Sequence, residues 1–490
     1  MSKIKKLFGQ TAIYGLGTIV PRFLNYLLTP LYTYLFTNPS DYGINAEIYA
    51  YISFLNIIFT YGMETAFFHF SNKYDSNKVF NNALSLLIIS TTFLSFILII
   101  FSNQFKQILH YNNTLFIYWT IGILASDTLL AIPFAYLRQQ QKALRFSILK
   151  LSNVLINILF NLFFFLVCKK YYDENSSHFL ARLYNPEIGI GYGFLSNLLA
   201  NISTILMMYP VWKKFHFFID KNLSKEMLRY ALPLLIVGLA GMINETFDRI
   251  ILKFLLPENI AQSAQGIYGA CYKLSILITI FIQAYRYAAE PFFFNAFKEA
   301  DAKQTYSKAT EAFIAFGLFL WLSTNLNLPI LQYFIGPSYR VGLSIVPVLL
   351  TANLFLGIYF NLSFWYKLTG QTQIGAYLTI FGAIITLIVN FIFVPKYSYV
   401  ASAYATLAAY GTMMILSYFL GQRYYPVSYP LKKITLYFVI SLILYFISNK
   451  ISFISNFHQI IFNNFLLVLF TLFLYYNYSS ILKFKKISHS

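Results

Sequence analysis

Apolar and polar residues alternate along this chain in long blocks. Mostly apolar runs are separated by short polar breaks, and a helix of roughly 20 apolar residues is enough to cross a bilayer. The breaks at residues 37–41 and 336–338 contain the Pro, Gly, Asn and Ser residues typical of turns. The pattern predicts fourteen membrane-spanning helices near residues 10–36, 41–70, 79–101, 112–138, 143–168, 187–211, 226–255, 264–294, 307–334, 341–367, 371–394, 398–420, 432–449 and 457–482.

Composition supports an all-α integral membrane protein. The 490 residues are 58% hydrophobic and 11% charged, with a mean hydropathy of +0.60, whereas soluble domains carry about 25% charged residues. The basic start, Lys3 to Lys6, leads into the first run without a small-residue cleavage site, so we expect that run to be retained as a span. Cys168 and Cys271 lie in or near apolar runs, a pattern that indicates neither a disulfide framework nor a metal site.

The basic residues predict the orientation in the membrane. The net charge of +19 is scattered over short loops, which favours an orientation signal over nucleic-acid binding. With fourteen spans and a cytoplasmic N-terminus, 23 Lys and Arg residues fall on the cytoplasmic side and 8 on the opposite side. This bias predicts that both termini are cytoplasmic. The other basic residues lie within spans: Arg22, Lys150, Arg249, Lys273 and Arg286.

A faint internal repeat predicts how the spans are grouped. The second span begins with residues 42–44 and the eighth with residues 265–267, both as an aromatic or polar residue followed by Gly-Ile. Matches at the far ends of these spans shift the offset from 223 to 226 residues. An offset of six spans relates two halves by an axis along the membrane normal, a known plan for transporters. We therefore expect two six-helix lobes, at 1–211 and 212–424, and two added helices at 425–490.

Eleven charged side chains inside the predicted spans are the functional candidates. Such groups are costly in lipid and normally face a protein interior or a wet cavity. Their spacing, at about 1.5 Å per residue, spreads them through the depth of the membrane, as a cavity that opens alternately to either side requires. The candidate substrate ligands are Arg22, Lys150, Arg249, Lys273 and Arg286. The candidate ion-coupling or gating groups are Glu47, Glu64, Asp127, Glu245, Asp248 and Glu290.

Several of these charges also have a purely structural interpretation. Glu245 and Arg249 stand four residues apart, so they could neutralise each other on one helix face. Arg286 and Glu290 have the same spacing. Lys150 could extend toward the inner interface.

Arg22, Asp127 and Lys273 are the strongest candidates because they lie deep and have no obvious partner on their own helices. Glu64 and Glu290, in contrast, lie near enough to the inner interface to be solvated there. Lys273 and Arg286 are separated by roughly 140° around a regular helix, so both cannot face one cavity centre unless the helix bends. Lys273 is therefore the better ligand candidate.

No soluble-enzyme motif competes with a transport function. The sequence has no Walker A motif, no glycine-rich dinucleotide fingerprint and no His/Cys metal spacing. We therefore expect no cofactor and no enzyme activity. Energy would come from an ion gradient, the membrane potential or the substrate gradient.

Three stretches of the chain carry recognisable motifs. They are Asp41-Tyr42-Gly43 with Gly62-Met63-Glu64-Thr65; Asp248-Arg249-Ile250-Ile251-Leu252; and Gly266-Ile267-Tyr268 with Tyr272-Lys273 and Ala288-Ala289-Glu290-Pro291-Phe292-Phe293-Phe294. In this order they resemble the opening two spans, the seventh-span Asp-Arg signature and the eighth span of the polysaccharide-biosynthesis flippases. These are the O-antigen and capsule (Wzx-type) members of the multidrug/oligosaccharidyl-lipid/polysaccharide (MOP) exporter superfamily. The resemblance covers nearly the whole chain, but its motifs are loose and do not identify the substrate.

The resemblance implies a multi-pass protein of the bacterial cytoplasmic membrane with a basic cavity between two lobes. Its expected cargo is an undecaprenyl-diphosphate-linked glycan, and its expected partners are membrane lipids, a glycan polymerase or other assembly proteins, without nucleic acid. Arg and Lys would bind the diphosphate through charge-assisted hydrogen bonds. The alternatives are a lipid II flippase, a multidrug or cation antiporter of the same superfamily, and, in another class, a membrane glycosyltransferase or a scaffold.

Overall fold

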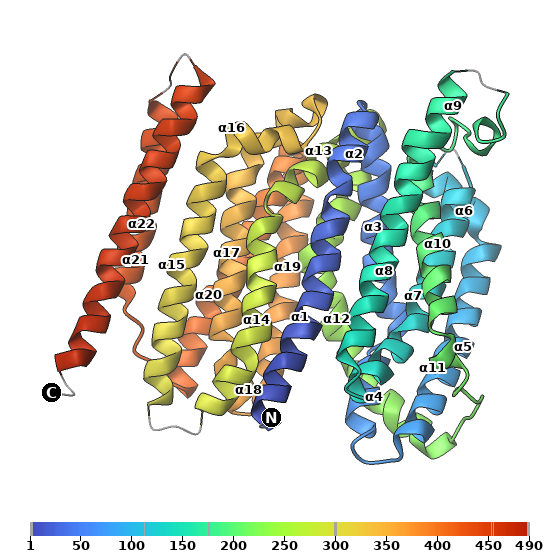
Figure 1. Cartoon of the computed structure of the whole chain (residues 1–490), viewed down its shortest axis with the longest axis horizontal. Helices are drawn as coiled ribbons and strands as arrows, with labels where there is room; N and C mark the ends of the chain where they lie inside the picture. The colour runs from blue at the N-terminus through green and yellow to red at the C-terminus, as the bar shows by residue number, and fades with distance from the viewer. Residues whose placement is uncertain are drawn as a thin grey trace. The chain divides into compact units, whose positions relative to one another are not determined.

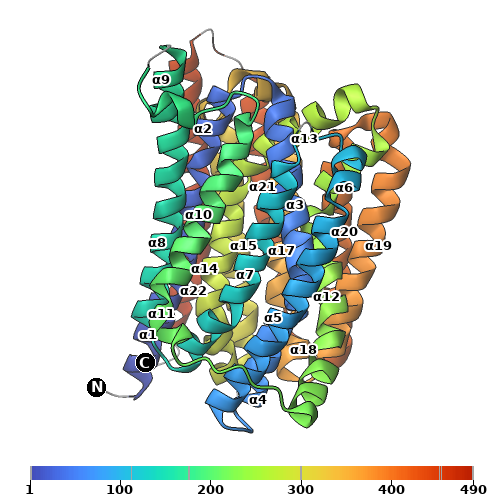
Figure 2. The ribbon, with the colours of Figure 1, turned by 90° about the vertical axis from the view of Figure 1, so that its right-hand side faces the viewer.

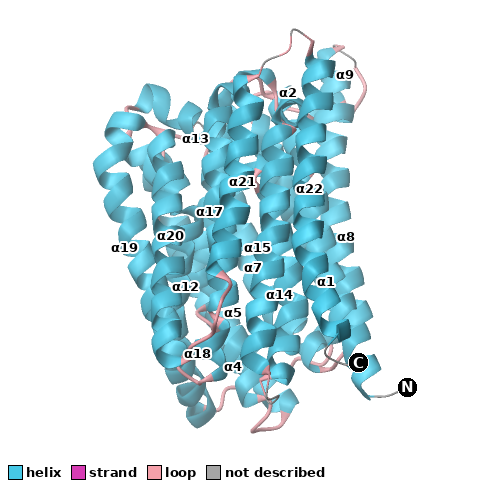
Figure 3. Cartoon of the chain, turned by 90° about the vertical axis from the view of Figure 1, so that its left-hand side faces the viewer, coloured by secondary structure: helices cyan, strands magenta, loops and turns pink. Residues whose placement is uncertain are grey.

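The computed structural model describes residues 3–111, 113–174, 177–297, 301–451, 453 and 455–487. Every regular element in these ranges is a helix, as Figure 3 shows. The prediction of an all-α membrane protein is confirmed. Packing divides the chain into two compact units, Met1–Gly269 and Ala270–Ser490, which we describe separately.

Unit 1 holds the helices up to most of α13, coloured blue to green in Figure 1. Short helical turns lie at Phe163–Cys168, Ala181–Leu183 and Gly189–Gly191. The helices are α1 (Lys3–Tyr26), α2 (Leu28–Leu35), α3 (Pro39–Thr60), α4 (Met63–Phe70), α5 (Ser76–Ile100), α6 (Ser102–Ile108), α7 (Leu115–Gln139), α8 (Ala143–Leu162), α9 (Lys169–Asp173), α10 (Tyr192–Met207), α11 (Tyr209–Trp212), α12 (Lys221–Leu255) and α13 (Glu258–Leu274).

The long helices of unit 1 pack side by side. Helix α8 contacts α1 and α10, and α7 contacts α3, α5 and α10. Helix α12 runs along α3 and also touches α4 and α5, an arrangement visible in Figure 2. The described residues of this unit include two large buried apolar clusters. One includes Phe67, Leu84 and Met227, and the other includes Ile48 and Leu124.

Local sequence signals set where these helices begin and end. Asn38 caps α3 by accepting a hydrogen bond from the backbone N–H of Ser40, and Asp75 caps α5 in the same manner. Asp220 caps α12 and forms an ion pair with Lys78 at 2.7 Å, and this Lys78 contact lowers the pKa of the Asp220 carboxyl. Gly62, at φ 74°, takes the left-handed conformation that separates α3 from α4.

Unit 2 contains the remaining helices. Short helical turns lie at Gln332–Phe334 and Pro337–Ile345. The helices are α14 (Ile276–Ala296), α15 (Ala302–Leu326), α16 (Leu328–Leu331), α17 (Val346–Leu362), α18 (Phe364–Leu368), α19 (Thr372–Tyr397), α20 (Tyr399–Tyr424), α21 (Leu431–Lys450) and α22 (Asn456–Ile487).

Helix α20 packs on both α17 and α19, whereas α15 links α17 to the pair formed by α21 and α22. Aromatic side chains dominate the buried clusters of this unit, including Tyr359, Trp365 and Tyr410 in one and Phe293 and Tyr306 in the other. The high Phe and Tyr content of the sequence therefore contributes directly to helix packing.

The described residues include 11 helices that are long and apolar enough to cross a membrane, or up to 12 if α13 and α14 form one span bent by 51°. The predicted count of fourteen is not confirmed. The two predicted spans outside this set correspond to α1–α2 and α3–α4, each of which is divided by a short break.

A close crossing of α3 and α13 within unit 1 supports the internal repeat. A Cβ atom added to Gly43 would lie 1.9 Å from the carbonyl oxygen of Gln262, and one added to Gly266 would lie 1.9 Å from that of Pro39. Gln262 follows Pro39 by 223 residues, and Gly266 follows Gly43 by the same number. Shifting each residue of one contact by 223 positions gives the residues of the other contact. The same two segments thus meet each other reciprocally, as they do at a local two-fold axis.

The compact units do not follow the lobe limits proposed from the repeat. Packing groups α12 and residues 258–269 with the N-terminal part of the chain, so the units divide at 269 and not at 211. The lobes at 1–211 and 212–424, and the added segment at 425–490, remain a prediction about the repeat. The side chains of Lys3, Lys5 and Lys6 and of the tail lysines Lys483, Lys485 and Lys486, and all of Lys298, lie outside the described residues.

We predict that Gly43→Ala and Gly266→Ala each destabilise the protein, because the new methyl group meets backbone that cannot move independently. Overpacking of this kind typically costs about 1–3 kcal/mol in the free energy of unfolding. Gly241→Ala is the matched control because nothing lies within 4 Å of its added Cβ. It should stabilise α12 by roughly 0.5–1 kcal/mol. Unfolding of the purified protein in detergent measures both effects, and equal stability of the three variants would contradict the crossing.

Candidate functional site

A buried ion pair in unit 1 joins α3 to α12. Lys253 Nζ lies 2.9 Å from the Glu47 carboxylate, and the two side chains are 6% and 0% exposed. Lys253 also donates to the carbonyl oxygen of Leu109 and lies 4.6 Å from the ring centre of Tyr111. The pair thus links two helices to the segment between α6 and α7. Lys253 is a residue that sequence reasoning missed, because it lies two residues from the end of the span predicted at 226–255.

A second polar contact joins α12 to α13. The hydroxyl of buried Tyr268 donates to Asp248, and Gln265 Nε2 donates to the backbone carbonyl of Arg249 at 2.6 Å. Asp248 is itself buried, whereas Glu245 on the same helix is exposed. Glu245 takes part in none of the ion pairs found among the described residues. The predicted pairing of Glu245 with Arg249 is therefore not seen there. Asp248 instead fastens the loop end of α12 to the next helix.

Asp127 on α7 lies in a network of amide and hydroxyl groups. Its Oδ1 accepts a hydrogen bond from Asn201 Nδ2 on α10 at 2.9 Å. Asn153 on α8 donates to Asn201 Oδ1 at 3.0 Å and to Thr204 Oγ1 at 2.9 Å. Three helices therefore meet at this carboxylate. A carboxylate surrounded by oxygen-bearing side chains has the donor types that bind a proton or a hard cation such as sodium.

Basic side chains gather beside Asp127. Lys150 Nζ lies 4.1 Å from the centre of the Phe134 ring, in cation–π geometry. Lys150 also interacts electrostatically with Asp127 and with two other cations, Arg22 on α1 and Arg138 on α7. Arg22 is exposed, so its guanidinium is available to a ligand. The structure thus brings together three residues singled out in the sequence: Arg22, Asp127 and Lys150.

Glu64 has a specific partner. Its carboxylate forms an ion pair with Arg138, and both side chains are partly exposed. Arg138 also stacks over the Phe68 ring, with its guanidinium carbon 4.8 Å from the ring centre. Glu64 is therefore held by protein contacts as well as by any solvent that reaches it.

A series of asparagines on α8 also escaped the sequence analysis. Tyr32 donates to Asn161 Oδ1 at 2.6 Å, Asn161 donates to Asn157 Oδ1 at 3.0 Å, and Asn157 donates to Asn25 Oδ1 at 3.1 Å. Asn153, Asn157 and Asn161 are four residues apart and therefore lie on one face of α8. That spacing within an apolar run was the available signal. The series joins α8 to α1 and α2 beside the Arg22–Lys150 group.

In unit 2, Arg286 and Glu290 have separate partners. Glu290 forms an ion pair with Lys367 at 2.9 Å, so its partner is not the predicted Arg286. The Arg286 guanidinium lies 4.0 Å from the centre of the Phe360 ring. Lys273 is partly buried near the end of α13, two residues before the bend at Ser275. Asn353 donates to Ser275 Oγ at 3.0 Å and so braces that bend.

Comparison with solved structures identifies the fold. The chain is similar to "Lipid II flippase MurJ, inward closed conformation", with a TM-score of 0.72, 16% identity, and coverage of 95% of this chain and 99% of that chain. An inward-facing multidrug resistance MATE family transporter of the MOP superfamily gives a TM-score of 0.59 at 14% identity, covering 84% of this chain and 94% of that chain. The outward-facing form gives 0.58 at 13% identity, with coverage of 86% and 95%. The fold is that of the MOP flippases and transporters.

The profile of the family described as "Polysaccharide biosynthesis protein" matches residues 8–297, and the chain belongs to that family. Comparison with curated protein sequences finds no match. The family assignment confirms the resemblance drawn from the sequence motifs. The protein is thus a multi-pass membrane protein of the polysaccharide biosynthesis family, with the fold of the solved MurJ and MATE structures.

We predict that Glu47→Gln and Lys253→Met each lower stability, because either change leaves a buried charge without its partner. Breaking a buried pair in this way typically costs about 3–5 kcal/mol. The double variant should recover most of the loss, since it removes both charges. Thermal unfolding in detergent tests this cycle. Lys169→Met, which breaks an exposed pair with Asp173, is the control and should cost less than about 1 kcal/mol. Additive losses at Glu47 and Lys253 would show that they are not coupled.

Proposed function

We propose that this chain is a flippase that carries an undecaprenyl-diphosphate-linked oligosaccharide across the cytoplasmic membrane by alternating access. One observation carries the proposal: Arg22 and Lys150 are grouped inside a helical unit of a polysaccharide-biosynthesis family member. Asp127 offsets only part of this positive charge, and an excess of like charge within a membrane bundle is unfavourable unless an anion binds it. A lipid diphosphate supplies such an anion.

The chemistry of the cargo fits these residues. Arg and Lys form charge-assisted hydrogen bonds to phosphate oxygens, and Arg does so in a bidentate manner. Lys273 and Arg286 are the corresponding candidates in unit 2, and Arg249 in unit 1 completes the set. The diphosphate would be shielded from hydrocarbon by these cations, while the polyprenyl tail remains in the lipid.

Asp127 is the best candidate for coupling transport to an ion. Asp127 touches α10 directly and α8 through Asn201, so a change in its charge would alter contacts among three helices. Binding of a proton or of sodium would neutralise the carboxylate and weaken its attraction for Lys150. Lys150 would then be available to the cargo phosphate. Glu47, Glu64, Asp248 and Glu290 have defined protein contacts and are better suited to stabilising or gating roles, while Glu245 remains a candidate for ion coupling.

Transport of lipid II is a second candidate function. The similarity to the solved structure of a lipid II flippase, at a TM-score of 0.72, favours it. Both cargoes present a polyprenyl diphosphate to the protein, so the cation group does not distinguish them. Membership in the polysaccharide biosynthesis family favours the surface glycan.

We predict that Arg22→Ala and Lys273→Ala each reduce surface glycan and increase lipid-linked glycan on the inner leaflet. Loss of one charge-assisted contact of about 1.5–3 kcal/mol should lower transport roughly tenfold or more. Radiolabelled lipid extracts and surface glycan staining report the two pools. Lys450→Ala removes an exposed charge at the end of α21 and should leave both pools unchanged. Normal surface glycan in both variants would refute the diphosphate role, and accumulation of lipid II instead would favour the second function.

We predict that Asp127→Asn abolishes the dependence of transport on pH or sodium, because an amide cannot gain or lose the relevant charge. Flipping into proteoliposomes, measured with and without each imposed gradient, tests this outcome. Asp173→Asn alters an exposed carboxylate and should retain the wild-type gradient dependence. If Asp127→Asn responds to both gradients as the wild type does, the coupling ion binds elsewhere.

A further inference from the structure

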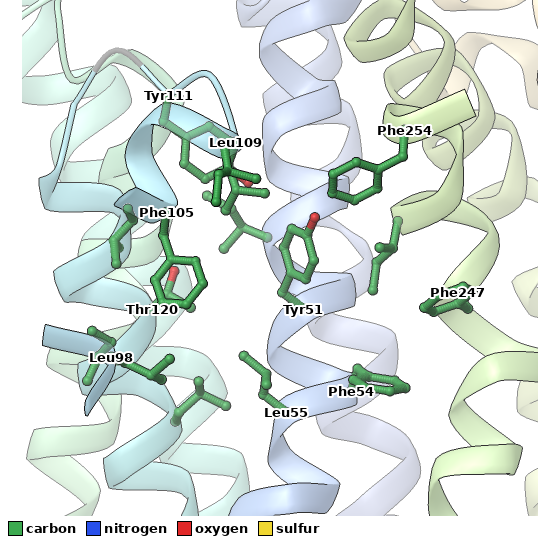
Figure 4. Close-up of a pocket in the computed structure, with 16 residues that line it drawn as sticks. Tyr51, Phe54, Leu55, Leu98, Phe105, Leu109, Tyr111, Thr120, Phe247 and Phe254 are labelled. Carbon is green, nitrogen blue, oxygen red and sulfur yellow. The ribbon is translucent and has the colours of Figure 1, made fainter. Parts of the chain in front are cut away.

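Unit 1 contains an apolar pocket of about 370 Å³ between α3, α6, α7 and α12. Figure 4 shows Tyr51, Phe54 and Leu55 of α3 facing Phe105 and Leu109 on one side, and Phe247 and Phe254 of α12 on the other. Its lining residues include neither Lys150 nor Arg22, so the cation group described above does not account for the pocket.

The walls of the pocket carry few groups that can form hydrogen bonds with water. Among its sixteen lining residues, polar side-chain atoms occur in Tyr51, Tyr111 and Thr120. The Thr120 hydroxyl already donates to the carbonyl oxygen of Phe116 at 2.7 Å. A site must supply several polar partners to hold a water molecule, and apolar cavities of roughly 150 Å³ stay dry and bind hydrocarbons. This pocket is more than twice that size, so hydrocarbon is the favoured occupant.

The pocket is open to the surface of the unit. Ile108 and Phe254 are 56% and 57% exposed at its rim, whereas Leu124 and Ile48 are almost fully buried in its walls. The surrounding helices α5, α7 and α12 are all apolar enough to cross a membrane, so the rim lies where lipid chains have access. A ligand can therefore enter from the bilayer without crossing water.

We propose that this pocket binds one fatty acyl chain of a membrane phospholipid. Phospholipid surrounds the protein at very high local concentration, so mass action fills even a weak site. Phospholipid acyl chains greatly outnumber polyprenyl tails in a bilayer, so the same mass action favours a phospholipid chain as the occupant. This inference does not depend on the identity of the transported cargo.

The bound chain also seals the buried ion pair. Tyr111 and Leu109 line the pocket, and both also contact Lys253. Hydrocarbon in the pocket excludes water from this region, and charges attract more strongly where the dielectric constant is low. The acyl chain thus acts as a structural element that fills the space between α3 and α12 and the α6–α7 segment.

A photoreactive phospholipid tests the proposal directly. The full-length protein is reconstituted in nanodiscs with a phospholipid that carries a diazirine midway along one acyl chain, then irradiated and mapped by mass spectrometry. We expect adducts on α3 and α7 pocket residues of the wild type. Leu55→Trp fills the pocket and should reduce these adducts about tenfold, because a bulky side chain takes the space of the ligand. Adducts on exposed Tyr475 and Tyr476 of α22 serve as the internal reference.

Leu159→Trp, which makes the same change at an exposed position of α8, should leave the pocket adducts unchanged. Leu55→Phe is the milder filling variant and decides the test if Leu55→Trp does not fold. Wild-type pocket adducts no more frequent than those on α22 would overturn the proposal. So would pocket adducts that persist after filling, or labelling of the pocket by a diazirine polyprenyl diphosphate and not by the phospholipid.

Discussion

The lack of water in the bilayer core governs this structure, because every buried polar group must find its partner within the protein. The Glu47–Lys253 pair shows the consequence most clearly. Neither charge can be solvated at an exposure of 0% and 6%, so the carboxylate, the ammonium, a backbone carbonyl and an aromatic ring are placed together. These contacts fix the position of α12 against α3. Several other helices of unit 1 pack against α3 or α12, which this ion pair holds together.

Polar contacts and close backbone approach replace the hydrophobic effect as the source of specificity between membrane helices. Lipid tails are as apolar as leucine, so apolar side chains alone do not select a neighbour. The asparagine series of α8 selects α1 and α2 through amide hydrogen bonds, and the Gly43–Gly266 crossing selects α13 for α3. Both features depend on small or polar residues within otherwise apolar runs.

The sequence predicted the helical class, the positions of most spans and the presence of charge within them. It did not predict the partners. Spacing rules describe one helix at a time, so they suggested Glu290 with Arg286, whereas tertiary packing pairs Glu290 with Lys367. Lys253 was missed because it lies within a few residues of a loop, although helix packing buries it. The asparagines were missed because Asn, Phe, Tyr, Ile and Lys are abundant along the chain, so single occurrences carry little information.

The charges of unit 1 fall into two groups with different consequences. Glu47 and Lys253 neutralise each other and leave no net charge for a ligand. Around α7 the charges are not balanced, because Arg138 is matched by Glu64 while Lys150 interacts with both Asp127 and Arg22. That neighbourhood keeps an excess of positive charge, and neutralising Asp127 would increase it. An anionic headgroup is the complement of such a site, so the same carboxylate that holds the helices together can also set the affinity for the cargo.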